Sequence, residues 1–158
     1  MIGYILLITT AIIISTIVYQ WAKTYIPTEP IECPDGVSIF VKESKYNCGN
    51  KELNLTLRNN GRFNIGGYLI HATTSPSQKL ASEDLSQYTE LGEGKGGAVI
   101  FVPFGNPIKP NNEIKNVFDL NSTNFSQMYS VEIIPIIHQD GKRINCAEAR
   151  IKEVLVCS

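Results

Sequence analysis

The first residues of the chain, Met1 to Trp21, carry no charged side chain, and Lys23 is the first charge. At about 1.5 Å of rise per residue, a helix of this length spans roughly 30 Å, the thickness of a bilayer's hydrocarbon core. Aromatic rings and lysines settle at membrane interfaces, and the residues expected there are Tyr4, Tyr19, Trp21, Lys23 and Tyr25. The pattern predicts one membrane-spanning helix over residues 1–25.

A cleaved signal peptide and a buried core helix are the two alternatives for this segment. A signal peptide needs a basic region before the apolar run and a small-x-small cleavage site after it. Only the α-amine precedes the run here, and the sequence from Trp21 to Tyr25 offers no small pair to cut. Core helices seldom run twenty residues without a charge. The sequence therefore favours a retained helix.

Proline-rich sequence separates the helix from the remainder of the chain. Pro27, Pro30 and Pro34 fall within eight residues, among acidic residues that favour contact with water. Proline removes a backbone donor and clashes with the preceding helical turn, and proline-rich linkers are extended and semi-rigid. We expect the helix to end near Tyr25 and a stalk to cover residues 26–36.

The remaining chain, residues 37–158, has the period of β-structure. Leu53, Leu55 and Leu57 alternate with Asn54, Thr56 and Arg58, which predicts a strand with one face in a core and the other in solvent. Asn59-Asn60-Gly61 and Asp140-Gly141 supply turns. The other expected strands are Val37–Val41, Tyr68–Ile70, Ala98–Phe104, Ile114–Leu120, Tyr129–Ile137 and Arg150–Val156.

Two segments interrupt this regular pattern. Pro135 inside the run Ile133–Ile137 indicates an edge position or a bulge. Leu80–Leu91 fits a short helix or a polar loop equally well. About seven short strands with little helical periodicity predict a mainly β fold, an antiparallel immunoglobulin-like β-sandwich that follows the single hydrophobic α-helix.

All four cysteines, Cys33, Cys48, Cys146 and Cys157, lie outside the helix. Their spacing contains no C-x-x-C pair, so disulfides are favoured over zinc, and an even number suits an oxidising compartment. In an immunoglobulin-like sandwich the first and last strands run in parallel, which would pair Cys33 with Cys146 and Cys48 with Cys157. A local Cys33–Cys48 bond stays possible if residues 43–45 form a hairpin turn. A Cys146–Cys157 bond is excluded if that segment is one extended strand.

Three N-x-[S/T] sequons place candidate N-glycosylation sites at Asn54, Asn121 and Asn124. The Asn54 sequon falls on the outward face of its strand. Sequons and cysteines together favour a short cytoplasmic N-terminus and a head domain outside the cell.

No pattern of catalytic or metal-binding residues stands out. His71 and His138 are expected at strand ends without a second ligand nearby, and the acids Glu29, Glu32 and Asp35 lack the spacing of a calcium loop. Gly92–Gly97 resembles a phosphate loop but lacks the Ser or Thr after its lysine, so a flexible exposed loop is favoured. We expect no enzyme activity, no cofactor and no small-molecule substrate.

The balance of charge also limits the partners. The net charge is −1 with a sequence pI near 6.1, which argues against nucleic acid, and the scattered lysines form no lipid-binding basic cluster.

An apolar N-terminal helix, a stalk and a β-domain with the run Leu53 to Gly61, continued by Phe63 to His71, resemble archaeal type IV pilins and archaellins. The resemblance implies a filament with bundled helices in its core and β-domains outside. A pilin signal ends in a basic and a small residue, whereas only Met1-Ile2-Gly3 stands before this apolar run, and this difference argues against processing and filament assembly of the pilin kind.

Two functions of different classes follow. The first is a pilin-like structural subunit that self-associates, with residues 1–25 as filament core and Thr9, Thr10, Ser15 and Thr16 as a packing face. The second is a monomeric, membrane-anchored module that binds the cell envelope or another cell through its loops. Both place the head at the cell surface.

Overall fold

The computed structural model describes residues 2–25, 32–102, 105–124 and 127–157. The chain divides into two compact units, Met1–Ile31 and Glu32–Ser158. The predicted stalk prolines Pro27 and Pro30 lie outside the described residues, whereas Cys33 belongs to the second unit, which we call the head.

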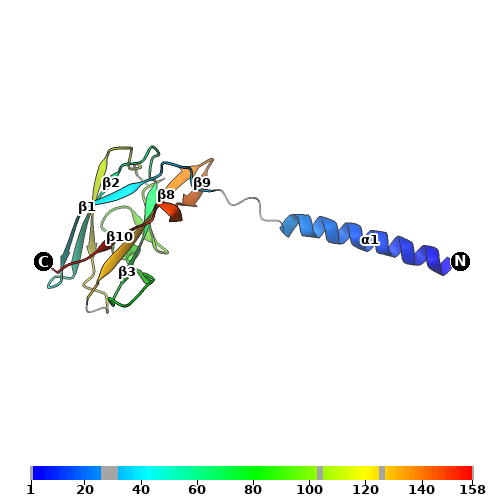
Figure 1. Ribbon diagram of the computed structural model, residues 1–158, viewed down its shortest axis with the longest axis horizontal. Coiled ribbons are helices and arrows are strands. Elements are labelled where there is room, and N and C mark those ends of the chain that lie inside the picture. The colour runs from blue at the N-terminus through cyan, green and yellow to red at the C-terminus, as the bar shows by residue number, and fades with distance from the viewer. Residues whose placement is uncertain (1, 26–31, 103–104, 125–126, 158) are drawn as a thin grey trace. The chain divides into compact units, whose positions relative to one another are not determined.

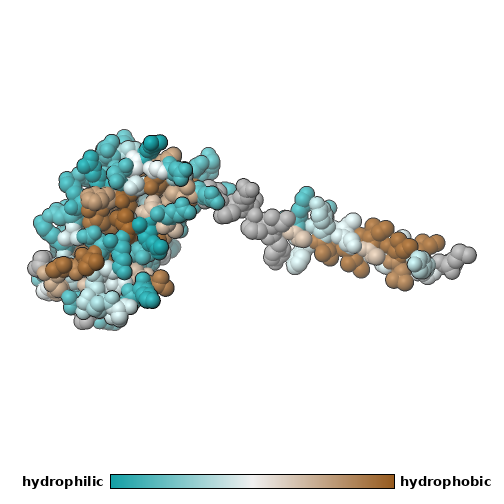
Figure 2. All heavy atoms as spheres, viewed as in Figure 1, coloured by the Kyte–Doolittle hydropathy of each residue, from teal (hydrophilic) through white to brown (hydrophobic). Residues whose placement is uncertain are grey.

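The first unit contains one helix, α1 (Ile2–Tyr25), which ends where the sequence predicts. The segment Gly3–Thr24 is long and apolar enough to span a bilayer. All of its described residues are exposed, and Figure 2 shows one face of it. The hydroxyl groups of Thr9, Thr10 and Thr16 each donate to a carbonyl of the preceding turn, at 2.8–3.0 Å. These bonds satisfy hydroxyls that would be costly to leave unpaired in hydrocarbon.

The head consists of two antiparallel sheets (Figure 1). The smaller has the order β1-β2-β7, formed by β1 (Ile39–Asn47), β2 (Glu52–Asn59) and β7 (Glu113–Asp119). The larger has the order β10-β8-β3-β6-β5, formed by β10 (Ile151–Val154), β8 (Ser130–Gln139), β3 (Gly67–Thr73), β6 (Ala98–Ile100) and β5 (Glu93–Lys95). Two further strands complete it, β4 (Glu83–Asp84) on β3 and β9 (Lys142–Asn145) on β8.

The hydrophobic core lies between these sheets. Leu53, Leu55 and Leu57 of β2 are fully buried and face Tyr68 and Ile70 of the larger sheet within one continuous cluster. Burying a leucine side chain contributes roughly 1.5–3 kcal/mol, so the alternating pattern of β2 accounts for much of the inner face of its sheet. The predicted mainly β, two-sheet sandwich after an N-terminal helix is confirmed.

The strands differ from the prediction chiefly where they are short. β4, β5 and β9 contain two to four residues each, too few for an alternating pattern to be recognised. Gly92–Gly97, expected as a flexible loop, contains β5, so that expectation was wrong. In Leu80–Leu91 the helical part is a single 3₁₀ turn, η1 (Ser86–Tyr88). Of the expected strand Ala98–Phe104, residues 103 and 104 lie outside the described residues.

Pro135 forms no bulge, but it does lie at an edge position, beside a local gap in the pairing on one side of β8. It lies in β8 opposite Tyr68 of β3, and β8 has neighbours on both sides. On the other side, β10 pairs with β8 only up to Ile133 and β9 only from Ile136 onward. The proline therefore sits where the neighbouring chain turns through a second 3₁₀ segment, η2 (Ala147–Ala149), and no ladder bond from its nitrogen is required.

Candidate functional site

Two disulfides join the first strand of the head to the last. Cys33 bonds to Cys146 and Cys48 to Cys157, with Cα–Cα distances of 5.2 and 5.4 Å. β1 lies between Cys33 and Cys48 in the chain, and β10 lies between Cys146 and Cys157. Each strand is thus bracketed by two cysteines, and the bracketing cysteines of one strand are bonded to those of the other.

The contacts between these strands explain the pairing. Tyr46 of β1 forms a parallel bridge with Cys157, and Ser44 Oγ donates to Glu153 Oε1 of β10 at 3.3 Å. This is the parallel arrangement that favoured the long-range pairing. The alternative turn at residues 43–45 is wrong, because these residues lie inside β1 and pair with β2. The disulfides therefore hold the edges of the two sheets together.

A buried polar chain connects the two sheets on the interior side. Asn116 of β7 donates from Nδ2 to the Tyr68 hydroxyl of β3 at 2.6 Å, and its Oδ1 accepts from Thr89 Oγ1 at 2.9 Å. Burial raises the pKa of the Tyr68 phenol well above its usual range, and the Asn116 hydrogen bond opposes the shift. Tyr68 is therefore a structural group that stays protonated.

We expect alkaline pH to weaken the head through Tyr68. The unfolded phenol loses its proton near pH 10 whereas the folded one does not, so stability is complete below pH 10 and falls above it, by up to about 1.4 kcal/mol per pH unit. Guanidinium unfolding of the wild-type chain and Tyr68→Phe at pH 9 and pH 11 checks this. The loss of stability between the two pH values should be smaller in the variant; equal losses would contradict it.

The outer face of the larger sheet, the face turned away from the core, carries a cleft of about 440 Å³. It is lined by Glu93 and Lys95 of β5, by Gly96 and Ile100, and by Arg143 of β9. Residues directly opposite each other on neighbouring strands project to the same face, and the register gives one row across the sheet: Glu93, Ile100, Gly67, Ile136 and Asn145. The cleft thus has charged walls on two different hairpins and an apolar floor.

Glycines on this face carry no side chains, so the surface there lies close to the backbone. A Cβ at Gly67 would lie 2.5 Å from the Val99 carbonyl oxygen, and one at Gly66 would meet the ring of His138. His71 packs against Gly97 in the same way. His138 lies near the end of β8 as expected, but His71 lies inside β3, opposite Asp84 of β4. Among the described residues no group of three His, Cys, Asp or Glu could hold a metal ion.

The candidate glycosylation sites differ in their surroundings. Asn121 is exposed in the turn after β7, where its backbone and side-chain amides both donate to Asp119 Oδ1. Asn54 is half-buried on β2, the middle strand of its sheet, and donates to Glu52 Oε1. Asn124 is exposed, but Phe125 and Ser126 of its sequon lie outside the described residues. Of the first two, Asn121 offers a glycan more room.

The expected interface residues of α1 are exposed at its two ends. Tyr4 lies near the first, and Tyr19, Trp21 and Lys23 near the second, with Lys23 Nζ 5.8 Å from the centre of the Tyr19 ring. The side chain of Tyr25 lies outside the described residues. Of the three acids that lack the spacing of a calcium loop, Glu32 and Asp35 belong to the head, and Glu29 lies outside the described residues.

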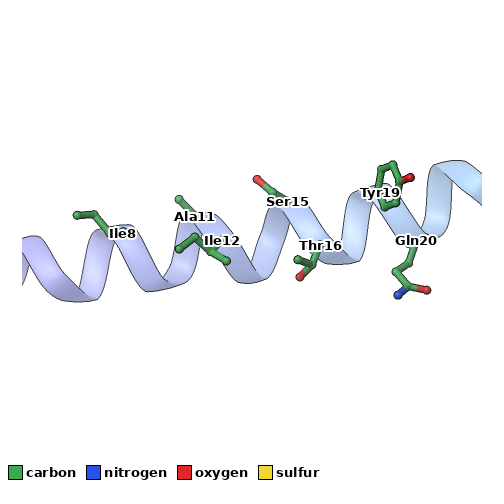
Figure 3. A pocket seen from close by; sticks show the side chains of 7 residues that line it. All are labelled: Ile8, Ala11, Ile12, Ser15, Thr16, Tyr19 and Gln20. Atoms are coloured by element: carbon green, nitrogen blue, oxygen red, sulfur yellow. The ribbon is translucent and has the colours of Figure 1, made fainter.

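One side of α1 bears a shallow groove (Figure 3). Ile8, Ala11, Ser15 and Tyr19 form one row along it, and Ile12, Thr16 and Gln20 form the other. By helical periodicity the opposite side carries larger aliphatic residues, among them Leu6, Ile13, Ile14 and Ile17. The groove side therefore combines small and polar residues with Ile8, Ile12 and Tyr19, whereas the opposite side is mostly bulky and aliphatic.

No protein-family model matches the chain, and no curated protein matches it. Among solved structures, the crystal structure of the human F-spondin reeler domain, fragment 1, aligns at 12% identity with a TM-score of 0.41, covering 79% of this chain and 92% of that one. Fragment 2 of the same domain aligns at 13% identity with a TM-score of 0.38, covering 83% and 98%.

The outer-face cleft is the feature that sequence reasoning missed. Gly92–Gly97 had been singled out as an exposed tip, but nothing connected it to Arg143, which is 48 residues away from Lys95 in the chain. Only the order of strands, in which β3 lies between the β5–β6 hairpin and the β8–β9 hairpin, brings them to one cleft.

Proposed function

We propose that the chain is a surface protein anchored by α1 in the membrane, whose disulfide-bonded head lies outside the cytoplasm and binds a component of the cell envelope or of another cell. The observation that carries the proposal is the combination of α1, which is long and apolar enough to span a bilayer, with a head whose four cysteines form two long-range disulfides. Oxidising conditions are needed for such bonds to persist.

The proposed role is one of binding rather than catalysis. The buried polar chain of Tyr68, Asn116 and Thr89 is accounted for by packing between the sheets, and the described residues offer no metal cluster. Exposed loops and hairpins on a rigid, cross-linked sandwich suit contact with a partner, because the sandwich fixes where they stand. We propose no cofactor, no small-molecule substrate of an enzymatic kind and no nucleic acid.

The anchor can be tested by placing a charge at the middle of α1. Arginine at the centre of a membrane helix costs about 2.5–3.5 kcal/mol on insertion scales, so Ile13→Arg is expected to shift the insertion equilibrium by roughly 100-fold. The measurement is the fraction of protein left in the membrane pellet after an alkaline carbonate wash, with Ile13→Leu as matched control. Release of the wild-type chain by the same wash would contradict the anchor.

A second candidate, a pilin-like filament subunit, is favoured by the groove on α1. Small residues such as Ala11 and Ser15 let helix backbones approach closely, and hydroxyl and amide side chains can bond between helices. In that case the helices would associate with one another and the heads would lie outside. The two candidates share the head's location and differ in whether chains polymerise.

Mechanical shearing of native cells separates the candidates. A filament subunit is expected as the main component of thin filaments in the sheared fraction, as seen by electron microscopy and peptide mass spectrometry. A tethered module is expected only in the membrane pellet, as a detergent-soluble monomer. In a filament, Ser15→Leu should reduce polymer yield, whereas Ile14→Leu on the bulky side should not.

A further inference from the structure

We propose that the outer-face cleft binds an acidic sugar, a saccharide unit that carries a carboxylate, with Lys95 and Arg143 holding the carboxylate. The proposal deepens the proposed function by naming the chemistry of the partner. It rests on three features of the cleft: two cations without ion-pair partners, an apolar floor, and a carboxylate among the cations.

The cations are available because nothing described in the head neutralises them. The ion pairs among the described residues join Lys42 and Arg58 to Glu113, Lys45 to Glu43, and Arg150 to Glu132. Lys95 and Arg143 form none, although both line the cleft with Glu93. Because they come from different walls, they can approach a bound carboxylate from two sides. Arginine also offers it two parallel N–H donors.

The floor of the cleft is apolar and shallow. Ile100 lines it, and in the register of the sheet it stands between Glu93 and Gly67. Gly67 contributes no side chain beside Ile100, whose Cδ1 lies 3.2 Å from where a Cβ of residue 67 would be. The C–H face of a sugar ring fits such a surface. The volume of about 440 Å³ falls within the roughly 300–1,000 Å³ of small-ligand sites.

Glu93 favours an acidic sugar over an acidic peptide as the ligand of the cleft. Its carboxylate is an acceptor for hydroxyl groups, which a sugar ring supplies and an acidic peptide largely lacks. The same negative charge would repel a dense polyanion such as a glutamate-rich peptide. A ligand with one carboxylate per hydroxyl-bearing ring therefore matches the cleft better than a ligand with charge alone.

The test uses the full chain in detergent micelles and trigalacturonate as the probe, with binding measured by titration calorimetry at low and physiological salt. Each charge-assisted hydrogen bond contributes about 1.5–3 kcal/mol, so Lys95→Gln with Arg143→Gln is expected to weaken binding at least tenfold. The matched control, Lys79→Gln with Lys109→Gln, removes two exposed charges outside the cleft and should leave binding unchanged. Near-UV circular dichroism verifies that each variant is folded.

Further variants and ligands distinguish an acidic sugar from an acidic peptide and from a neutral sugar. Glu93→Ala should weaken trigalacturonate binding several-fold and should not weaken binding of triglutamate. Absence of trigalacturonate binding at millimolar concentration, equal loss in the control variant, or equal binding of the neutral trisaccharide would each overturn the proposal. Tighter binding of triglutamate would overturn it in favour of an acidic peptide. These measurements use purified protein, so they stand apart from the carbonate and shearing experiments that test the location of the chain.

Discussion

Removing both disulfides is expected to lower the free energy of unfolding of the head by roughly 8 kcal/mol, enough to unfold many domains. The first bridge closes a loop of more than 100 residues, since its cysteines are 113 apart in sequence. In the chain-entropy description such a loop contributes about 5 kcal/mol. With that bridge in place, the second closes a ring of only roughly 26 residues, which contributes about 3.5 kcal/mol.

The stabilisation from one bridge depends on whether the other is present, so removal of either bridge alone is expected to cost about the same. Cys33→Ala with Cys146→Ala, or Cys48→Ala with Cys157→Ala, should each cost about 3–4 kcal/mol, because the remaining bridge already shortens the other's loop. Guanidinium unfolding of the full chain in detergent, followed by near-UV circular dichroism, measures both pairs and the quadruple variant. An unchanged unfolding midpoint in the quadruple variant would show that packing alone holds β1 against β10.

Truncating Phe118 is expected to cost the head about 3–5 kcal/mol, the usual range for Phe→Ala in a core. Phe118 is fully buried in β7, opposite Leu53 of β2, and a bridge to Thr89 covers its other side. Phe118→Ala would leave a cavity in the core next to β7, which is the last strand in the order of the smaller sheet. The same unfolding experiment measures the loss.

Phe40→Ala is the matched control, because Phe40 is 53% exposed on β1. Its substitution removes the same atoms from a side chain that contributes far less burial, so a change below about 1 kcal/mol is expected. Comparable losses from the two substitutions would mean that Phe118 does not anchor β7 in the core.

How much of this fold can be predicted from the sequence depends on the length of each pattern. The uncharged run of α1 and the alternation from Leu53 to Leu57 are long enough for their periods to be unmistakable, and both elements form as expected. β5, with three residues, cannot show a period of two, and its glycine conceals its strand character. β1 was predicted short because Lys42 to Lys45 are polar; neighbouring β2 and the proximity of β10 override that local preference.

The candidate sites also differ in how far the sequence predicts them. Cysteines can be found by identity alone, and an expected parallel arrangement of two strands was enough to favour their pairing. Arg143 and Lys95 are ordinary surface residues in the sequence, and the hydrogen-bonded chain of Tyr68, Asn116 and Thr89 has no periodic signature. Such sites arise from the order of strands in a sheet, which local propensity does not determine.

The position of the disulfides also determines the order in which the cysteines become available during synthesis. Cys33 and Cys48 are synthesised more than 100 residues before their partners Cys146 and Cys157, which at about 5–20 residues per second is a delay of roughly 5–20 s. During that interval each early thiol has only the other to bond with. A Cys33–Cys48 bond would have to be broken again, because β1, about 30 Å long when extended, must separate these two residues in the folded head. Wherever that early bond forms, maturation of this chain depends on an environment that reshuffles disulfides as well as on one that forms them.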